Sequence, residues 1–509
     1  MAGAADASPR HVRGAEPPVR TSTASEERAA RRLEALRAGG DPRRLRDFFH
    51  RLPKGADLHN HLSGAVTTEY LVELAARSGL CVDATMTAVD APCGAGARPA
   101  ADARTDRDFR AAIVRAWSMQ DFPRGGNGHD HFFDTFQKFS RATWDHRGRM
   151  LAEVANGMAE QNQFYLETMV SPASEETNRL ADEVGWHKDL ARLHGKLTAG
   201  GKLDKVVAAA RKEADGTDAQ FRAANHCGTK KARPGCDLPV RWIAQVGRTG
   251  PSQRVFTQLA LGMRLAERDG RFVAVNLVQP EDEKNALRNY SLHMRMIDYL
   301  RKVYPKAHVT LHAGELWPGL VKPEELKSHI GQAVNTARAE RIGHGVDLVH
   351  EDHWQKTART MAGREIAVEV PLTSNAQILG VRGPDHPFPT YRRFGVPVVL
   401  ATDDPGVSRT DISREYQYAA QTYDLSYPEL KDLARASLEY AFLPGKSLWR
   451  GNPTQEGYRL TGVCDTGRPG AAKPAARCEH LLNGSPKAAA QWRQEAAFRH
   501  FESRAGTKA

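Results

Sequence analysis

The chain has 509 residues, 40% of them hydrophobic, and its 72 Lys and Arg against 61 Asp and Glu give a formal net charge of +11. This length allows a large catalytic domain with added segments, and the absence of any run of about 18 consecutive apolar residues argues against a membrane-spanning helix. The basic residues are scattered and lack interleaved aromatic residues, so we expect neither a nucleic acid nor a membrane as a partner.

The sequence divides into three segments with different expected roles. Residues 1–52 should form a polar tail and a basic amphipathic helix, and their lack of an apolar core predicts no secretion signal. The run Glu26–Arg51 carries four candidate buried positions: Leu33, Leu36, Leu45 and Phe48. Residues 53–450 should form the main domain, and residues 451–509 a C-terminal extension.

Short β-branched or apolar runs recur between helical stretches from Pro53 onward, which is the alternation of parallel βα units. Eight of these runs are predicted strands: Gly55–His61, Phe164–Val170, Val240–Val246, Phe272–Val278, His308–His312, Arg341–Val346, Ile366–Leu372 and Val398–Thr402. A doubly wound sheet would be expected to carry a glycine-rich phosphate loop early, whereas the first strand here ends in His59-Asn60-His61. We therefore predict an α/β fold, a TIM (β/α)8 barrel with an N-terminal helical extension.

Long insertions follow the first and second strands. The first contains the Gly/Ala/Pro-rich stretch Ala91–Ala101, and the second contains a Lys/Arg/Ala-rich helix near Lys202–Ala223. Long connections of this kind often cover an active site or form an oligomer contact. The sequence leaves open whether the chain forms a homodimer.

The six cysteines fall into three close pairs: Cys81 with Cys93, Cys227 with Cys236, and Cys464 with Cys478. Their spacing matches no zinc-ribbon or CxxC redox signature. We favour three local disulfides over six separate thiols, and disulfides indicate an oxidising compartment, either secreted or periplasmic.

Polar residues gather at the carboxyl ends of the predicted strands, where closed barrels place their chemistry. His59 and His61 end the first strand and, because side chains alternate along a strand, they point to the same side. His312 ends the fifth strand and Asp403 follows the last. Three His and a carboxylate suffice to hold a divalent ion and leave a position for water, and zinc is the usual choice.

Three more polar residues stand at these strand ends. Glu315 follows His312, His344 ends the sixth strand, and Asp404 follows Asp403. Hydrolysis at an electron-poor carbon needs a base, an acid for the developing anion and a group that holds the substrate, and these residues are candidates for the three tasks. The stretch Pro371–Asn375, after the seventh strand, is a candidate support of the site.

Taken together, these motifs resemble those of the adenosine deaminase family, within the metal-dependent amidohydrolase superfamily. The resemblance covers Pro53–Leu443 and rests on HxHLxGA, HAGE, GHG and TDDP in the family's chain order. The segment Phe132–Phe139 resembles the subgroup related to secreted adenosine deaminase growth factors.

The resemblance implies one zinc ion per chain, with these ligands: His59, His61, His312 and Asp403. It makes Glu315 the acid that protonates purine N1, His344 the group that orients and deprotonates the attacking water, and Asp404 the acceptor of a hydrogen bond from N7. Attack at C6 and loss of ammonia would then convert adenosine to inosine, and we expect 2′-deoxyadenosine to react in the same way.

Two departures from the family pattern bear on the substrate. Ser63 stands where family members often carry an Asp that contacts ribose, and Gln279 stands within a stretch where the family often uses a Gly to approach the purine. Gly64 is retained, and its lack of a side chain would let the first loop lie close to a ligand. We predict that these three residues, with Gly314 and Asp404, bind the purine nucleoside.

Three functions remain open at this point. Deamination of adenosine is favoured. A zinc-dependent deaminase or amidohydrolase for a different or modified purine nucleoside is supported by Ser63 and Gln279. A nucleoside-binding or growth-factor-like signalling protein is the third, and the intact set of acid, base and ligands argues against it. The HxE and PCxxC signature of cytidine and tRNA deaminases is absent.

Overall fold

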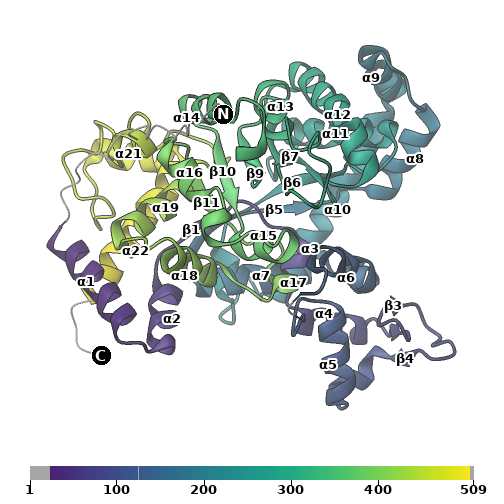
Figure 1. Ribbon diagram of the computed structural model, residues 1–509, viewed down its shortest axis with the longest axis horizontal. Coiled ribbons are helices and arrows are strands. Elements are labelled where there is room, and N and C mark those ends of the chain that lie inside the picture. Colours follow the sequence, from purple (N-terminus) through teal and green to yellow (C-terminus); the bar gives the residue numbers. More distant parts are fainter. Residues whose placement is uncertain (1–22, 124, 505–509) are drawn as a thin grey trace, which may run out of the picture.

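A computed structural model describes residues 23–123 and 125–504 (Figure 1), so most of the expected N-terminal tail lies outside the described residues. An eight-stranded parallel sheet lies at the centre, in the order β1-β5-β6-β7-β8-β9-β10-β11. Its strands are β1 (Gly55–Asp57), β5 (Gln163–Val170), β6 (Val240–Gly247), β7 (Phe272–Val278), β8 (His308–Ala313), β9 (Arg341–His344), β10 (Ala367–Val370) and β11 (Val398–Leu400). Helices surround the sheet, which confirms the predicted (β/α)8 barrel.

All eight predicted strands are present, with ends that differ by a few residues. The first strand is the largest correction, because it ends at Asp57 rather than His61. Beyond Asp57 the backbone leaves the ladder and makes only single bridges, from Asn60 to Asp403 and from His61 to Met169. The bridge between Asn60 and Asp403 joins the ends of β1 and β11 and closes the barrel.

The helices after the strands form the outer layer. They include α8 (Ser174–Val184), α11 (Ser252–Arg268), α12 (Lys284–Val303), α13 (His329–Asn335), α14 (Trp354–Gly363), α16 (Phe388–Arg393), α18 (Ile412–Thr422) and α19 (Tyr427–Glu439), followed by α21 (Ala476–Gly484) and α22 (Pro486–Arg504). Helix α11 shows why they pack there, because it buries Val255, Leu259 and Met263 at spacings of four residues along one face.

The predicted single N-terminal helix is two helices, α1 (Ala24–Ala38) and α2 (Pro42–Arg51). Gly39 ends the first helix, and Gly40 has a φ of 65°, a left-handed conformation that glycine adopts readily. Asp41 caps the second helix by accepting hydrogen bonds from two backbone amides. Amphipathic spacing predicted the buried faces of both helices but not this break. The four candidate apolar positions are all buried: Leu33, Leu36, Leu45 and Phe48.

The two extensions meet on the outside of the barrel, where α22 lies beside α1 and α19 (Figure 1). The ring of Phe48 lies 5.1 Å from that of Phe501. On the same side, the buried ammonium of Lys431 in α19 donates to Glu26 Oε1 of α1 at 2.9 Å and to Glu502 Oε1 of α22 at 2.7 Å. We call this assembly of α1, α19 and α22 the terminal clasp.

The two insertions lie beside the barrel and pack against each other. The first holds α3 (Leu62–Ala65), α4 (Thr68–Arg77), β2 (Cys81–Val82), β3 (Ala88–Val89), β4 (Arg98–Pro99), α5 (Arg107–Ala116), α6 (Gly128–Thr143) and α7 (Arg147–Glu160). The second holds α9 (Leu190–Thr198) and α10 (Lys202–Ala224), and α10 matches the helix predicted there. The small sheet β3-β2-β4 projects from the barrel together with α5 (Figure 1).

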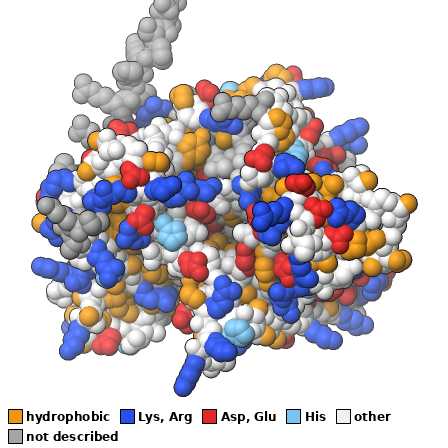
Figure 2. All heavy atoms as spheres, turned by 90° about the horizontal axis from the view of Figure 1, so that it is seen from below, with side chains coloured by type: hydrophobic (Ala, Val, Ile, Leu, Met, Phe, Trp, Pro, Cys, Tyr) orange, Lys and Arg blue, Asp and Glu red, His pale blue; other side chains and the backbone are white. Residues whose placement is uncertain are grey.

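All three predicted cysteine pairs are disulfides, with Cα–Cα distances of 5.5, 5.6 and 4.7 Å. Each closes a short loop outside the barrel strands. Acidic and basic side chains are mixed over the face in Figure 2, without a single-sign field. No helix in the described residues combines the length and the apolar character needed to cross a bilayer.

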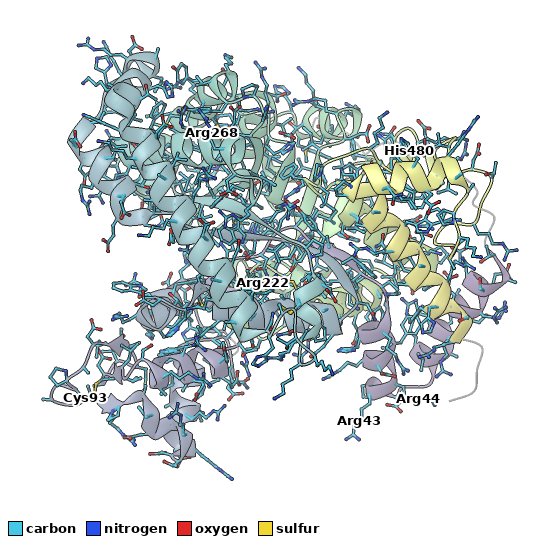
Figure 3. The ribbon with its side chains drawn as sticks, turned by 180° about the vertical axis from the view of Figure 1, so that it is seen from behind. Arg43, Arg44, Cys93, Arg222, Arg268 and His480 are labelled. Atoms are coloured by element: carbon cyan, nitrogen blue, oxygen red, sulfur yellow. A yellow bond between two sulfur atoms is a disulfide. The ribbon has the colours of Figure 1, made fainter. Side chains whose placement is uncertain are left out.

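Replacing Phe48 with Ala should lower the free energy of unfolding by about 3–5 kcal/mol, because a large buried ring is removed from the packing of α2 on α22. The turnover number should stay unchanged, since Phe48 lies outside the barrel mouth. Chemical denaturation followed by circular dichroism measures the loss. The matched control is Arg43→Ala, because Arg43 projects from the same helix into solvent (Figure 3). An equal loss in both variants would contradict the packing argument.

Candidate active site

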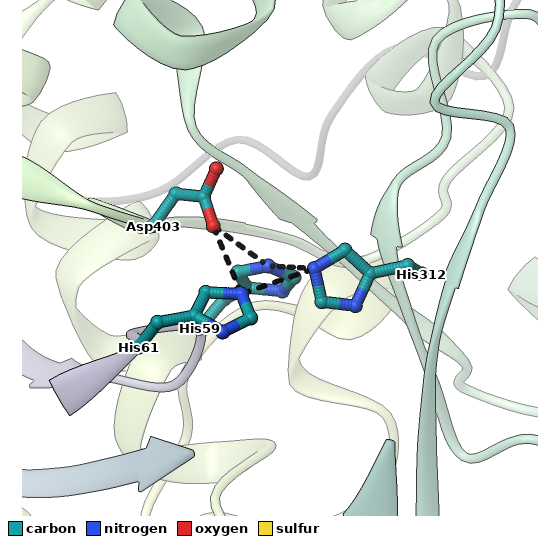
Figure 4. Close-up of side chains that lie close together, drawn as sticks. All are labelled: His59, His61, His312 and Asp403. Atoms are coloured by element: carbon teal, nitrogen blue, oxygen red, sulfur yellow. Dashed lines mark hydrogen bonds and ion pairs between the residues drawn. The ribbon is translucent and has the colours of Figure 1, made fainter. Parts of the chain in front are cut away.

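Four side chains from three strand ends converge at the carboxyl mouth of the barrel (Figure 4). His59 Nε2 lies 3.1 Å from His312 Nε2, and His61 Nε2 lies 3.2 Å from the same atom. Asp403 Oδ1 lies 3.3 Å from Nε2 of both His59 and His61. These are the four residues predicted as metal ligands, and three of them are almost completely buried.

The opposite nitrogen of each imidazole faces an oxygen acceptor. Nδ1 of His59 lies 2.7 Å from Glu369 Oε2, and Nδ1 of His61 lies 3.2 Å from Gln245 Oε1. Nδ1 of His312 lies 2.9 Å from Asn276 Oδ1. An acceptor at Nδ1 holds the ring proton there and leaves the Nε2 lone pair bare.

This geometry fits a cation. Three bare nitrogen lone pairs and a carboxylate would repel one another at these distances, and Asp403 Oδ1 is buried with no hydrogen-bond partner among the described residues. A divalent metal ion turns each of these contacts into an attraction. Nitrogen and carboxylate donors in this number suit a borderline-soft ion and leave a coordination position open.

A second polar group lies beside the first. His344 Nε2 is 3.6 Å from Glu315 Oε1 and 4.0 Å from Asp403 Oδ2. Burial, helped by the charge of Asp403, raises the pKa of Glu315 to about 8. Burial lowers the pKa of His344 to about 4. At neutral pH Glu315 therefore holds a proton and His344 is neutral, so the pair offers one acid and one base.

Two residues of this site have an uncommon backbone conformation. His344 has a φ of 64° and Asp403 a φ of 61°, in the left-handed region of backbone conformation that residues other than glycine rarely adopt. Helix α15 (Leu372–Ile378) restrains both, because Asn375 Oδ1 lies 2.8 Å from His344 Nδ1 and Ser374 Oγ donates to Asp403 Oδ2 at 2.7 Å. The stretch Pro371–Asn375 thus contacts the site as expected.

A family model described as adenosine deaminase matches residues 119–448. The chain belongs to the adenosine deaminase family. Together with the His and Asp cluster, this membership makes the protein a metal-dependent hydrolytic deaminase.

Two curated relatives illustrate the range of the family. An aminodeoxyfutalosine deaminase of Streptomyces coelicolor is 28% identical over 421 residues, which is 80% of this chain and 84% of that protein. An adenosine deaminase of Salmonella typhimurium is 39% identical over 137 residues, which is 27% of this chain and 38% of that protein. The first relative matches most of the chain at a lower identity, and the second matches a short part of it at a higher identity.

Solved structures share the fold. The N6-methyl-AMP deaminase of Arabidopsis thaliana superposes with a TM-score of 0.52 at 21% identity, over 78% of this chain and 94% of that one. The adenine deaminase of Arthrobacter aurescens gives a TM-score of 0.50 at 16% identity, over 77% of this chain and 94% of that one. At these identities the similarity establishes the barrel.

The loop after β1 is packed more tightly than the sequence suggested. A Cβ on Gly64 would lie 1.8 Å from Asp404 Oδ1, so the missing side chain makes room for this carboxyl group rather than directly for a ligand. Burial and the neighbouring charge of Asp403 raise the pKa of Asp404 well above its usual value. Ser63 is half-buried in α3 beside it.

The other two predicted substrate contacts are engaged within the chain. Gln279 has a φ of 80°, a conformation that favours glycine, and its Oε1 accepts a hydrogen bond from Thr249 Oγ1 at 2.6 Å. The backbone amide of Gly314 donates to Glu281 at 3.2 Å, and its φ of 75° forms the turn that leads to Glu315. Their predicted contacts with the substrate stay predictions.

Five side chains that support the site were not identified from the sequence: Gln245, Arg248, Asn276, Glu281 and Glu369. Glu281 accepts the backbone amide of Glu315 at 2.9 Å, and the buried Arg248 donates to the carbonyl of His312 at 3.1 Å. Three of the five are polar residues within largely apolar strands, at Gln245, Asn276 and Glu369. A polar residue within a buried strand is a signal that could have found them, because burial without a partner is unfavourable.

Replacing Gly64 with Ala should lower kcat/KM by about a hundredfold or more, because the added methyl group displaces Asp404 by a distance that active sites do not tolerate. Steady-state kinetics and metal content measure the effect. Gly157→Ala is the matched control, since Gly157 lies within helix α7 with no atom near its Cβ position. That variant should keep full activity and gain up to about 1 kcal/mol of stability. Full activity in Gly64→Ala would contradict the packing seen here.

Proposed function

We propose that this protein hydrolyses adenosine, and 2′-deoxyadenosine, to the corresponding inosine and ammonia with the help of one zinc ion. The observation that carries the proposal is the position of Glu315 and His344, 3.6 Å apart, beside three converging imidazoles. An amidine carbon flanked by a ring nitrogen is the kind of centre that such an acid and base can hydrolyse.

In the proposed reaction, His59, His61, His312 and Asp403 would hold the zinc ion, which would lower the pKa of a water molecule enough for it to lose a proton near neutral pH and attack C6. Glu315 donates its proton to N1, so that the ring accepts the electron pair displaced from the C6–N1 bond. His344 Nε2 takes a proton from the attacking water and delivers it to the departing amine. The bond from C6 to the amine then breaks, the remaining hydroxyl proton returns to Glu315 as the C6 carbonyl forms, and inosine and ammonia leave.

The proposed role of Asp404 differs in direction from the expectation from sequence. N7 of a neutral purine has a lone pair and no proton, so it can only accept a hydrogen bond. Burial and the charge of Asp403 raise the pKa of Asp404, which favours the protonated carboxyl group that a hydrogen bond to N7 requires. Its Oδ1 is buried with no partner among the described residues, as expected for a group that awaits a ligand.

A modified adenine nucleoside is a second candidate substrate. The relative that matches four-fifths of this chain is named an aminodeoxyfutalosine deaminase, and Ser63 and Gln279 depart from the common family pattern. Membership in the secreted growth-factor subgroup also stays a proposal. It is supported by the three disulfides, which suit an extracellular or periplasmic compartment.

The proposed substrate predicts that zinc-loaded protein removes the ultraviolet absorbance of adenosine, and that chelation abolishes the activity until zinc is restored. The assay should be repeated with 2′-deoxyadenosine, 5′-deoxyadenosine, AMP and adenine. Chelator-sensitive conversion of adenosine supports the proposal. Silence towards all five compounds in protein that holds one equivalent of metal would contradict it and favour the modified nucleoside.

The proposed acid predicts that Glu315→Gln lowers kcat by about 10²–10⁴-fold, because general acid catalysis is worth this much. Zinc content and calorimetric binding of inosine should remain close to wild type, since the ligands are untouched. Glu324→Gln, at an exposed position on the same strand-to-helix connection, is the matched control and should keep full activity. A purely binding function would instead leave every measured property of Glu315→Gln unchanged.

A further inference from the structure

We infer that Asp282, oriented by His129, binds the sugar hydroxyls of the substrate and selects neutral nucleosides over their 5′-phosphates. This inference rests on the proposed function, because it takes the purine to be held with C6 near the metal ligands. It assigns a sugar contact in a protein where the family's usual carboxylate is replaced by Ser63.

The start of helix α6 lies against two loops on one side of the barrel mouth. A Cβ on Gly128, the first residue of α6, would lie 2.1 Å from the carbonyl oxygen of Gln377 in α15, which follows β10. Shortly before α6, the amide of Met119 donates to the carbonyl of Val407 at 2.8 Å, in α17 (Pro405–Ser408) after β11. The segment is thus held against the carboxyl ends of β10 and β11.

From this position His129 reaches the opposite side of the mouth. Its Nε2 lies 3.0 Å from Asp282 Oδ1, in the loop after β7. β7 is the fourth strand in the sheet order and β11 is the eighth, so they face each other across a closed eight-stranded barrel. The pair of His129 and Asp282 therefore spans the mouth, and Asp282 directly follows Glu281, which accepts the backbone amide of Glu315 at 2.9 Å.

The shape of a purine nucleoside brings its sugar to this level. The sugar is attached at N9, at the end of the purine ring system opposite C6 and N1. With N1 at Glu315 and C6 at the floor of the site, the sugar must point outward to the mouth. Ser63 there is a short neutral side chain, whereas Asp282 offers a carboxylate that is still 19% exposed while it contacts His129. Hydroxyl groups donate to carboxylates in strong, charge-assisted hydrogen bonds.

The charges around His129 disfavour a phosphate. His129 Nδ1 also lies 2.8 Å from Asp130 Oδ1. Burial lowers the pKa of His129, but the hydrogen bonds to Asp282 and Asp130 outweigh this effect and raise it to about 9. One imidazolium between two carboxylates leaves a net negative charge, which repels a 5′-phosphate but accepts hydroxyl groups. The same arrangement fixes the rotamer of Asp282.

The test compares wild type with Asp282→Asn on adenosine, 5′-deoxyadenosine, 2′-deoxyadenosine and AMP. We expect KM for adenosine to rise about tenfold or more, with kcat nearly unchanged, because a charge-assisted hydrogen bond in binding is lost. The ratio of kcat/KM for adenosine over AMP should fall about tenfold. The deoxynucleoside that lacks the hydroxyl contacted by Asp282 should have a lower kcat/KM than adenosine with the wild type. With Asp282→Asn, the two nucleosides should have similar kcat/KM.

His129→Gln should raise KM for adenosine in the same direction but less strongly, because a neutral amide can still orient Asp282. It should not lower the preference for adenosine over AMP, because loss of the imidazolium leaves the charges of Asp282 and Asp130 uncompensated. The matched control is Asp134→Asn, which lies farther along α6, is 50% exposed and pairs with Lys138. Its kinetics should equal those of wild type. Melting temperature and metal content verify that each variant is folded, and His129→Gln carries the test if Asp282→Asn does not fold.

An unchanged KM for adenosine in Asp282→Asn or His129→Gln would overturn the inference while leaving the deaminase function intact, as would an unchanged preference over AMP in Asp282→Asn. If wild type converts no adenosine, the proposed function fails separately. Calorimetric titration with inosine then tests the sugar contact alone, where equal affinity of wild type and Asp282→Asn would overturn the inference and a loss of about tenfold would support it.

Discussion

The backbone bridge that closes the barrel also builds the metal site. The amide of His61 donates to the carbonyl of Asp403 at 3.0 Å, and the amide of Asp403 donates to the carbonyl of His59 at 2.8 Å. Three of the four converging side chains therefore belong to the residues that join the first strand to the last. Any error in the closure would separate the ligands, so barrel formation and assembly of the site depend on the same two hydrogen bonds.

Beneath this bridge, buried charges hold the imidazoles in place. Arg341 donates to Glu369 at 2.5 Å and to Glu167 at 2.6 Å, and Glu369 in turn contacts His59. Burial disfavours the charge of Glu369, but Arg341 and His59 more than offset this and lower its pKa to about 2. Buried ion pairs of this kind add little net stability, and their value here lies in fixing the direction of a ring.

The sequence was informative where a residue's role depends on its position in a strand. Strand ends pointed to His59, His61, His312 and Asp403, because a barrel collects its strand ends on one rim. The supporting acceptors could not be derived, since partners such as Asn276 and His312 meet only through strand pairing. The position of α6 at the barrel mouth could not be predicted either, because a helix within a long insertion can pack on several faces of a barrel. Gly64 and Asp404 were both identified from the sequence, but their close contact was not.

The terminal clasp has a consequence for how the molecule unfolds. Lys431 belongs to α19, the last helix of the barrel, and its charge is neutralised in the interior by one carboxylate from α1 and one from α22. Release of either outer helix would break one of the two buried ion pairs of Lys431, which is unfavourable. The three helices are therefore expected to behave as one cooperative foldon, with similar protection of their amides against hydrogen exchange, rather than as appendages that fray before the barrel.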